Sequence, residues 1–182
     1  MNKKKYIILI IFLIASHGML VANQDSVKSR IPISIKAGYK APSEGNYHST
    51  NSGFGLSLSA RFLFSNKFSF HPSFFLWTSK YKFINPYHEN ITLKSISALI
   101  GYQFDIREFT IEPKLGLGLS KASDTSKQLF TSFLGVGLNY NYDADIRIQL
   151  DILQQNASVF DVGGSGPLFD NILLLFGFEF TL

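Results

Sequence analysis

The sequence has no cysteine, and beyond its first 22 residues it has no long run of apolar residues. The missing cysteine excludes a disulfide framework, thiolate metal sites and a lipid anchor attached through cysteine. The four histidines show no metal-ligand spacing, so we expect no metal and no other cofactor. The missing apolar runs exclude a bundle of membrane-spanning helices, although the chain is 46% hydrophobic. That combination is typical of a membrane protein made of strands.

The first 22 residues have the pattern of a signal peptide. Lys3, Lys4 and Lys5 precede an apolar run over residues 6–15, and small residues follow it. The run is shorter than the ~20 residues that a spanning helix needs. We therefore predict a cleaved signal peptide at 1–22, followed by one domain.

Charge gives no support for nucleic-acid binding. Three of the 17 basic residues lie in the predicted leader, which leaves 14 against 13 acidic residues. A nearly neutral chain has no basic surface of the kind that nucleic acid attracts. The remaining domain, 23–182, has the length of a single domain.

The last twelve residues show the pattern on which the fold prediction depends. Every even position from Ile172 to Leu182 is apolar, whereas the odd positions include Glu179 and Thr181. A period of two predicts a strand with one wholly apolar face. Seven earlier segments repeat it: 31–41, 53–64, 68–79, 91–104, 109–119, 130–142 and 146–153. In strand 68–79, Pro72 cannot donate a ladder hydrogen bond, so we expect a local bulge or a missing bond there.

Short turns and long polar loops alternate between these eight segments. This layout predicts an all-β fold, an eight-stranded antiparallel up-and-down transmembrane β-barrel, with short turns on the periplasmic side. The apolar faces then point into lipid. Aromatic residues near the strand ends predict interfacial rings. We place Phe64, Phe68, Phe104, Phe109, Tyr140, Tyr142 and Phe180 in the periplasmic ring, and Tyr39, Phe54, Phe130 and Phe176 in the outer one.

The C-terminal strand resembles the assembly signal of bacterial outer-membrane barrels, in which a glycine, an aromatic and a terminal apolar residue alternate. Gly177, Phe180 and Leu182 occupy those positions. The chain as a whole resembles the small eight-stranded outer-membrane barrels of the OmpA/OmpX type. The resemblance implies location in the bacterial outer membrane, and as partners the outer-membrane lipid, lipopolysaccharide and the barrel assembly machinery. It also implies roles in adhesion, envelope anchoring, porin-like conduction or, in a few members, lipid A modification.

The inward faces predict two kinds of lumenal site. Charged residues of both signs collect toward the periplasm, and we expect a salt-bridged network because buried charges must be paired. Its predicted members are Lys36, Arg61, Glu112, Lys114, Arg147, Asp151 and Glu179. Toward the outside, large apolar residues lie among glycines and serines. These either fill the lumen or line a pocket for a small apolar ligand, formed by Phe75, Trp77, Leu99 and Leu173.

Three functions remain open from the sequence. The first is a non-enzymatic structural or surface-interaction protein that binds an extracellular ligand or partner through its long loops. Candidate contact residues in the loops are Tyr47, His48, Tyr81, Tyr87, His88, Phe160 and Phe169. The second is a carrier or narrow conduit for small apolar molecules. The third, a lipid A-modifying enzyme, rests on His71 and Ser73; a lumenal histidine is the simpler interpretation, so we assign no catalytic residue.

Overall fold

The computed structural model describes residues 30–44, 49–64, 67–81, 90–123, 128–159 and 169–181. The chain divides into two compact units, 1–30 and 31–182. The predicted signal peptide lies outside the described residues. No helix within the described ranges is long and apolar enough to cross a membrane.

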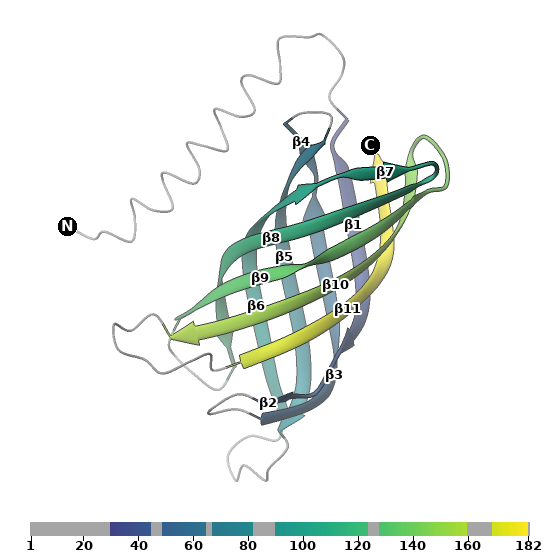
Figure 1. The fold of residues 1–182 in the computed structure, drawn as a ribbon. Coiled ribbons are helices and arrows are strands. Elements are labelled where there is room, and N and C mark those ends of the chain that lie inside the picture. Colours follow the sequence, from purple (N-terminus) through teal and green to yellow (C-terminus); the bar gives the residue numbers. More distant parts are fainter. Residues whose placement is uncertain are drawn as a thin grey trace, which may run out of the picture. The chain divides into compact units, whose positions relative to one another are not determined.

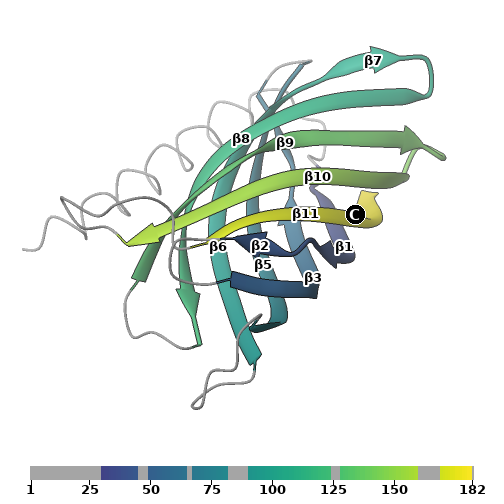
Figure 2. The ribbon, with the colours of Figure 1, turned by 60° about the horizontal axis from the view of Figure 1, so that its bottom comes forward.

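Strands account for nearly all of the described chain. They are β1 (Pro32–Lys40), β2 (Ser43–Glu44), β3 (Ser49–Ala60), β4 (Phe62–Leu63), β5 (Phe68–Tyr81), β6 (Asn90–Tyr102), β7 (Phe104–Ile106), β8 (Phe109–Ala122), β9 (Gln128–Asn141), β10 (Ile146–Val159) and β11 (Phe169–Thr181). The eight long strands each pair antiparallel with the strands before and after them, in the cyclic order β1-β3-β5-β6-β8-β9-β10-β11. Figure 1 shows β8 to β11 forming the nearer wall and β1, β3, β5 and β6 the farther one, and Figure 2 shows the same strands from another side.

The barrel is closed by pairing between its first and last strands. On one side, β1 pairs with β11 from Pro32 and Thr181 to Lys40 and Leu173. On the other side, β1 pairs with β3 from Ile33 and Ala60 onward. The sheet therefore has no open edge between its long strands, and the predicted eight-stranded up-and-down barrel is confirmed.

Pro72 explains a break between β3 and β4. Ser59 pairs with Ser73 and Phe62 pairs with Phe70, which is one continuous register that places Ala60 opposite Pro72. Proline has no N–H for the ladder. Of the two outcomes expected at Pro72, the structure therefore has the missing hydrogen bond and not the bulge.

Pro113 has the same effect between β6 and β7. The pairs Gly101 with Lys114 and Phe104 with Ile111 share one register, which places Tyr102 opposite Pro113. The strands β4 and β7 are thus continuations of β3 and β6, interrupted where the neighbouring strand has a proline.

Several strands extend beyond the hydrophobic pattern that predicted them. β10 runs to Val159 instead of ending at residue 153, and β3 begins at Ser49 instead of residue 53. The added residues are mostly polar on both faces, so the apolar alternation ends before the strand does. The barrel therefore reaches farther toward the outside than the sequence indicated.

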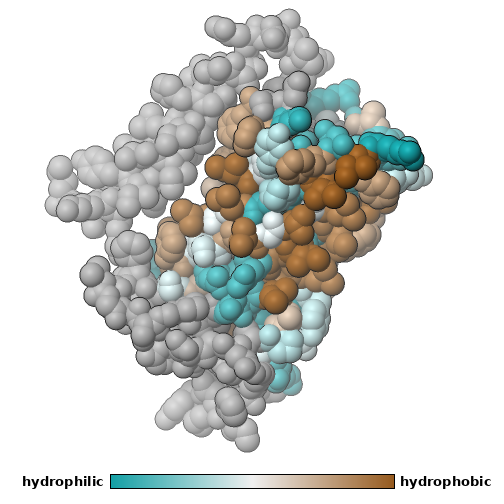
Figure 3. Space-filling view, in the orientation of Figure 1, coloured by the Kyte–Doolittle hydropathy of each residue, from teal (hydrophilic) through white to brown (hydrophobic). Residues whose placement is uncertain are grey.

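The apolar face of every long strand points outward. Ile96, Leu115 and Leu134 are 71%, 60% and 63% exposed, whereas the alternate residues are buried in the lumen. On the face seen in Figure 3, hydrophobic residues form a broad band, and hydrophilic residues gather toward the strand ends. This arrangement inverts that of a water-soluble domain and matches a surface that faces hydrocarbon.

Aromatic side chains gather at the end that carries the short turns. Phe68 and Tyr102 meet edge to face with centroids 4.9 Å apart, and Phe109 lies 5.0 Å from Tyr140. Exposed Tyr39 and Phe54, paired across β1 and β3, lie nearer the opposite end. Phe176 is the eighth of the 13 residues of β11, so it lies in the middle of the hydrophobic band and not in an outer ring.

A lysine in the middle of this band should destabilise the barrel strongly. We predict that Leu115→Lys lowers the free energy of unfolding by about 2 to 4 kcal/mol, because its neighbours Ile100 and Leu134 are also lipid-facing. Ile106→Lys, beside the two-residue turn at 107–108, should cost about 0 to 1 kcal/mol. Denaturant unfolding in phosphatidylcholine vesicles measures both. Equal effects of the two variants would contradict the assignment of the band to hydrocarbon.

Candidate functional site in the barrel lumen

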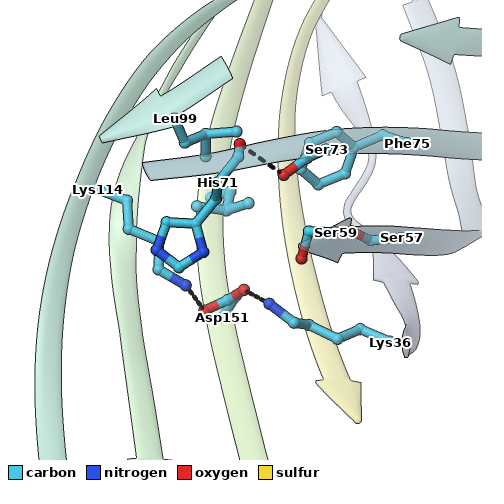
Figure 4. A pocket seen from close by; sticks show the side chains of 10 residues that line it. Lys36, Ser57, Ser59, His71, Ser73, Phe75, Leu99, Lys114 and Asp151 are labelled. Carbon is cyan, nitrogen blue, oxygen red and sulfur yellow. Dashed lines mark hydrogen bonds and ion pairs between the residues drawn. The ribbon is translucent and has the colours of Figure 1, made fainter. Parts of the chain in front are cut away.

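Asp151 lies at the centre of the first lumenal ion-pair cluster. Its carboxylate accepts hydrogen bonds from Lys36 and, at 2.8 Å, from the Nζ of Lys114. These three residues come from β10, β1 and β8, so the cluster links strands on different sides of the ring (Figure 4). Both lysines are nearly fully buried, and their pairing with one carboxylate offsets the cost of desolvating the charges.

Glu112 forms the second cluster and is connected to the first through Lys114. The Nζ of Lys114 lies 3.2 Å from Oε2 of Glu112. The same carboxylate accepts a hydrogen bond from the hydroxyl of Ser69 and contacts Nε2 of His71 at 3.0 Å. The side chain of Glu112 is completely buried, so each of these donors replaces water that the carboxylate has lost.

Glu179 forms the third cluster, in which four residues surround its carboxylate. Nε and Nη2 of Arg61 donate to it at 3.1 and 2.8 Å, and Gln149 donates at 3.1 Å. Ser34 also donates at 3.2 Å, and Nη1 of Arg147 lies 3.8 Å away. The two-bond contact with the guanidinium fixes orientation as well as charge. The cluster ties β11 to β1, β10 and the residue between β3 and β4.

All seven residues of the predicted charge network thus lie together in three linked or neighbouring clusters. His71 joins them, as do Ser34, Ser69, Gln103, Asn139 and Gln149. Sequence reasoning placed His71 in the lumen but did not single out the other five polar partners. Their inward position followed from the alternation, but the carboxylate that each would meet depends on pairing between strands.

The outer half of the lumen is filled by an apolar layer. The rings of Phe75 and Phe133 stack with centroids 4.9 Å apart. Trp77, Leu99 and Leu173 are no more than 2% exposed. The other buried members are Ile91, Leu93, Ala122, Leu129, Leu153, Ala157 and Leu175. Eight-stranded barrels leave a lumen that side chains can fill, and this one is filled.

Two buried polar residues lie at this level, Lys40 on the inward face that its strand pattern predicts and Gln155, which was not anticipated. Oε1 of Gln155 accepts a hydrogen bond from the indole N–H of Trp77 at 2.7 Å, and its Nε2 donates to Ser95 at 2.9 Å. Lys40 is fully buried, and its Nζ lies 5.0 Å from the Trp77 ring centroid and donates to Thr50. Gln155 lies in the part of β10 that the sequence analysis assigned to a loop. Continuing the inward alternation from Asp151 would have found it.

A small cavity separates the charged and apolar halves. Its volume, measured as the space open to the centre of a water molecule, is about 10 Å³, which is room for about one water. Figure 4 shows Lys36, His71, Lys114 and Asp151 on one side and Phe75 and Leu99 on another. Of the four predicted pocket residues, Phe75 and Leu99 line this cavity, whereas Trp77 and Leu173 are packed in the apolar layer.

His71 and Ser73 are not arranged as a catalytic pair. The hydroxyl of Ser73 donates to the main-chain carbonyl of His71 at 3.1 Å (Figure 4). Nε2 of His71 contacts Ser69 and Glu112 instead. A base that activates a serine needs its ring nitrogen at the hydroxyl. Both residues are also buried in the lumen. No group of three metal-binding side chains occurs within the described ranges.

The predicted assembly signal lies on β11. Gly177 pairs with Lys36 and Gln149, and a side chain there would overlap the backbone carbonyl of Ile35. Phe180 faces outward, 39% exposed. Leu182 lies outside the described residues, as do the loop candidates Tyr47, His48, Tyr87, His88 and Phe160. Tyr81 ends β5 and Phe169 begins β11.

Neutralising Glu112, the buried carboxylate at the centre of the second cluster, should destabilise the barrel. We predict that Glu112→Gln lowers the free energy of unfolding by about 3 to 5 kcal/mol, because Lys114 and the neighbouring donors lose a buried partner. Glu108→Gln, in the exposed turn after β7, removes the same charge without a buried partner and serves as the control. Thermal unfolding in detergent, followed by the gel mobility of heated samples, measures both. An unchanged melting temperature for Glu112→Gln would refute a stabilising network.

Comparison with known proteins supplies the family. The model of the outer membrane protein beta-barrel domain matches residues 9–180. No curated protein matches the chain.

Solved structures show the same fold at low sequence identity. Neisserial surface protein A is 16% identical with a TM-score of 0.66, and the match covers 84% of this chain and 97% of that one. OprG from Pseudomonas aeruginosa is 13% identical with a TM-score of 0.58, covering 85% and 97%. Ail of Yersinia pestis is 18% identical with a TM-score of 0.51, covering 84% and 99%. The family match over nearly the whole sequence, on a closed barrel with an apolar exterior, shows that this chain belongs to the outer membrane protein beta-barrel domain family and is located in the bacterial outer membrane.

Proposed function

We propose that this protein is a non-enzymatic surface-interaction protein, whose barrel is a rigid support for the segments at its outer end. The observation that carries the proposal is the filled lumen. Ion pairs occupy its inner half, an apolar layer occupies its outer half, and the cavity between them has room for about one water. A filled interior supports a function on the outside, where a stable scaffold can hold variable loops.

The segments that would carry the contacts connect the outer ends of the strands. They are residues 45–48, 82–89, 124–127 and 160–168, and they include five of the seven candidates named above, Tyr47, His48, Tyr87, His88 and Phe160. One solved relative suggests a first probe. The Ail protein of Yersinia pestis, described as an attachment invasion locus protein, has been crystallised with the heparin analogue sucrose octasulfate; it is 16% identical with a TM-score of 0.53.

The test separates the loops from the barrel. We expect cells that display the protein to adhere to heparin-coated surfaces or to cultured epithelial cells more than cells without it. Replacing 82–89 and 160–168 by glycine–serine segments of equal length should abolish that gain, because the barrel contributes no contact of its own. Heat-modifiable gel migration confirms that the variant still folds. Undiminished adhesion of the folded variant would contradict a role for the loops.

The second candidate, a carrier for small apolar molecules, is supported only by the apolar character of the outer lumen. Trp77 is the single tryptophan in the sequence and lies within that layer, so its fluorescence reports on the lumen directly. Because the surrounding side chains are already packed, we expect no change in emission when aliphatic alcohols are titrated into the folded protein. A saturable shift that Leu173→Phe abolishes by filling the space would favour the carrier function instead.

A further inference from the structure

Two exposed lysines face each other on the outer surface of the barrel. Lys94 on β6 and Lys121 on β8 are direct partners in the antiparallel register, and both side chains point away from the lumen. Partners in such a register have Cβ atoms about 4.5 to 5.5 Å apart, and two like charges in that position destabilise a sheet. Neither lysine forms an ion pair with any described residue.

The chemistry of the neighbouring rows places this pair at a membrane boundary. One step toward the short turns lie outward-facing Ile96 and Leu119, which belong to the hydrophobic band. One step toward the outer end lie Thr92 and Ser123, where the hydroxyl of Ser123 accepts a hydrogen bond from the Thr92 N–H at 3.0 Å. On β6 and β8 the surface therefore changes from apolar to cationic to hydroxyl-bearing over two steps of the strand.

The pair lacks a carboxylate on the strands around it. In the outer halves of β5, β6, β8 and β9 the outward-facing described residues include no aspartate or glutamate, and Gln128 is the partner of Lys121 on β9. Lysines near a membrane interface can simply extend toward water. That behaviour explains one lysine, but it brings no counter-charge to two adjacent ones, and the described residues around them supply none.

We propose that Lys94 and Lys121 form a binding site for a phosphate group of the phosphorylated glycolipid of the outer leaflet, the lipid A part of lipopolysaccharide. A phosphate between the two ammonium groups neutralises both charges. The acyl chains of the bound glycolipid lie against Ile96 and Leu119, and its sugar hydroxyls lie at the level of Thr92 and Ser123. The charge of the pair, its depth and its polar outer border all fit this one lipid. The proposal rests on the location in the outer membrane and not on the surface-interaction function.

The experiment compares lipids that differ only in phosphate. Purified protein in nanodiscs of neutral phospholipid is titrated with diphosphoryl lipid A and with the same lipid A after removal of its phosphates, and binding is measured by native mass spectrometry. We expect the phosphorylated lipid to bind more tightly to the unmodified protein. The double variant Lys94→Gln/Lys121→Gln should lose this preference, with binding weaker by about 30-fold, or about fivefold for each lysine.

Matched variants make the result specific. Lys67→Gln removes an exposed lysine at the opposite end of the barrel and should leave the preference unchanged. Lys94→Arg/Lys121→Arg keeps the charges and should retain it. Gel migration of unheated samples verifies folding of each variant. The assignment to lipid A is overturned if the glutamine double variant keeps the preference, or if phosphatidylglycerol or inorganic phosphate at the same concentration binds the pair equally well.

Discussion

The pairing of β1 with β11 is the constraint on which the rest of this structure depends. In hydrocarbon an unpaired backbone N–H or C=O has no water to bond with, so a sheet can span a membrane only if its edges meet. Once the ring is closed, the alternation of side chains decides everything else. One face of each strand must be apolar because it meets lipid, and the other must fill a lumen too narrow to stay empty. The inversion of polarity relative to a soluble protein is therefore a consequence of closure.

Closure also explains why so many charges are buried. Lys36, Lys114 and Arg61 lie in a space that lipid and bulk water do not enter, and each meets a carboxylate supplied by another strand, Asp151 for both lysines and Glu179 for the arginine. Replacing both members of a buried ion pair by apolar residues often costs no stability. Removing one member alone is strongly destabilising, because the other charge is left buried without a partner. The pairs also favour one register, because a slip by one residue would move every charge into the lipid.

The two-residue alternation in the sequence predicted the strands and the direction of their side chains. It could not predict which side chains meet across the barrel, because that depends on the pairing of strands. The eight strands, their faces and the seven lumenal charges follow from alternation alone. Gln155 was assigned to a loop because, above the hydrophobic band, the outward residues Gln154 and Asn156 are polar and the alternation disappears while the strand continues. Likewise, that Glu112 would meet Ser69 and His71 required the β5, β6 and β8 registers, which no local pattern encodes.

The two halves of the lumen differ in a way that bears on function. A conduit for ions would need a hydrated path along its whole length, yet Trp77, Phe75 and Phe133 fill the outer half and leave no room there for a hydrated ion. In the polar inner half the three carboxylates pair with the buried cations, whereas Nη1 of Arg61 and Oε1 of Gln149 have no hydrogen-bond partner among the described residues. Selection for a transported molecule would favour space and unpaired groups, whereas selection for rigidity would favour packing and pairing. The packed outer layer and the paired charges of the inner half fit the second set better, and this is the basis for proposing a function at the outer surface of the barrel.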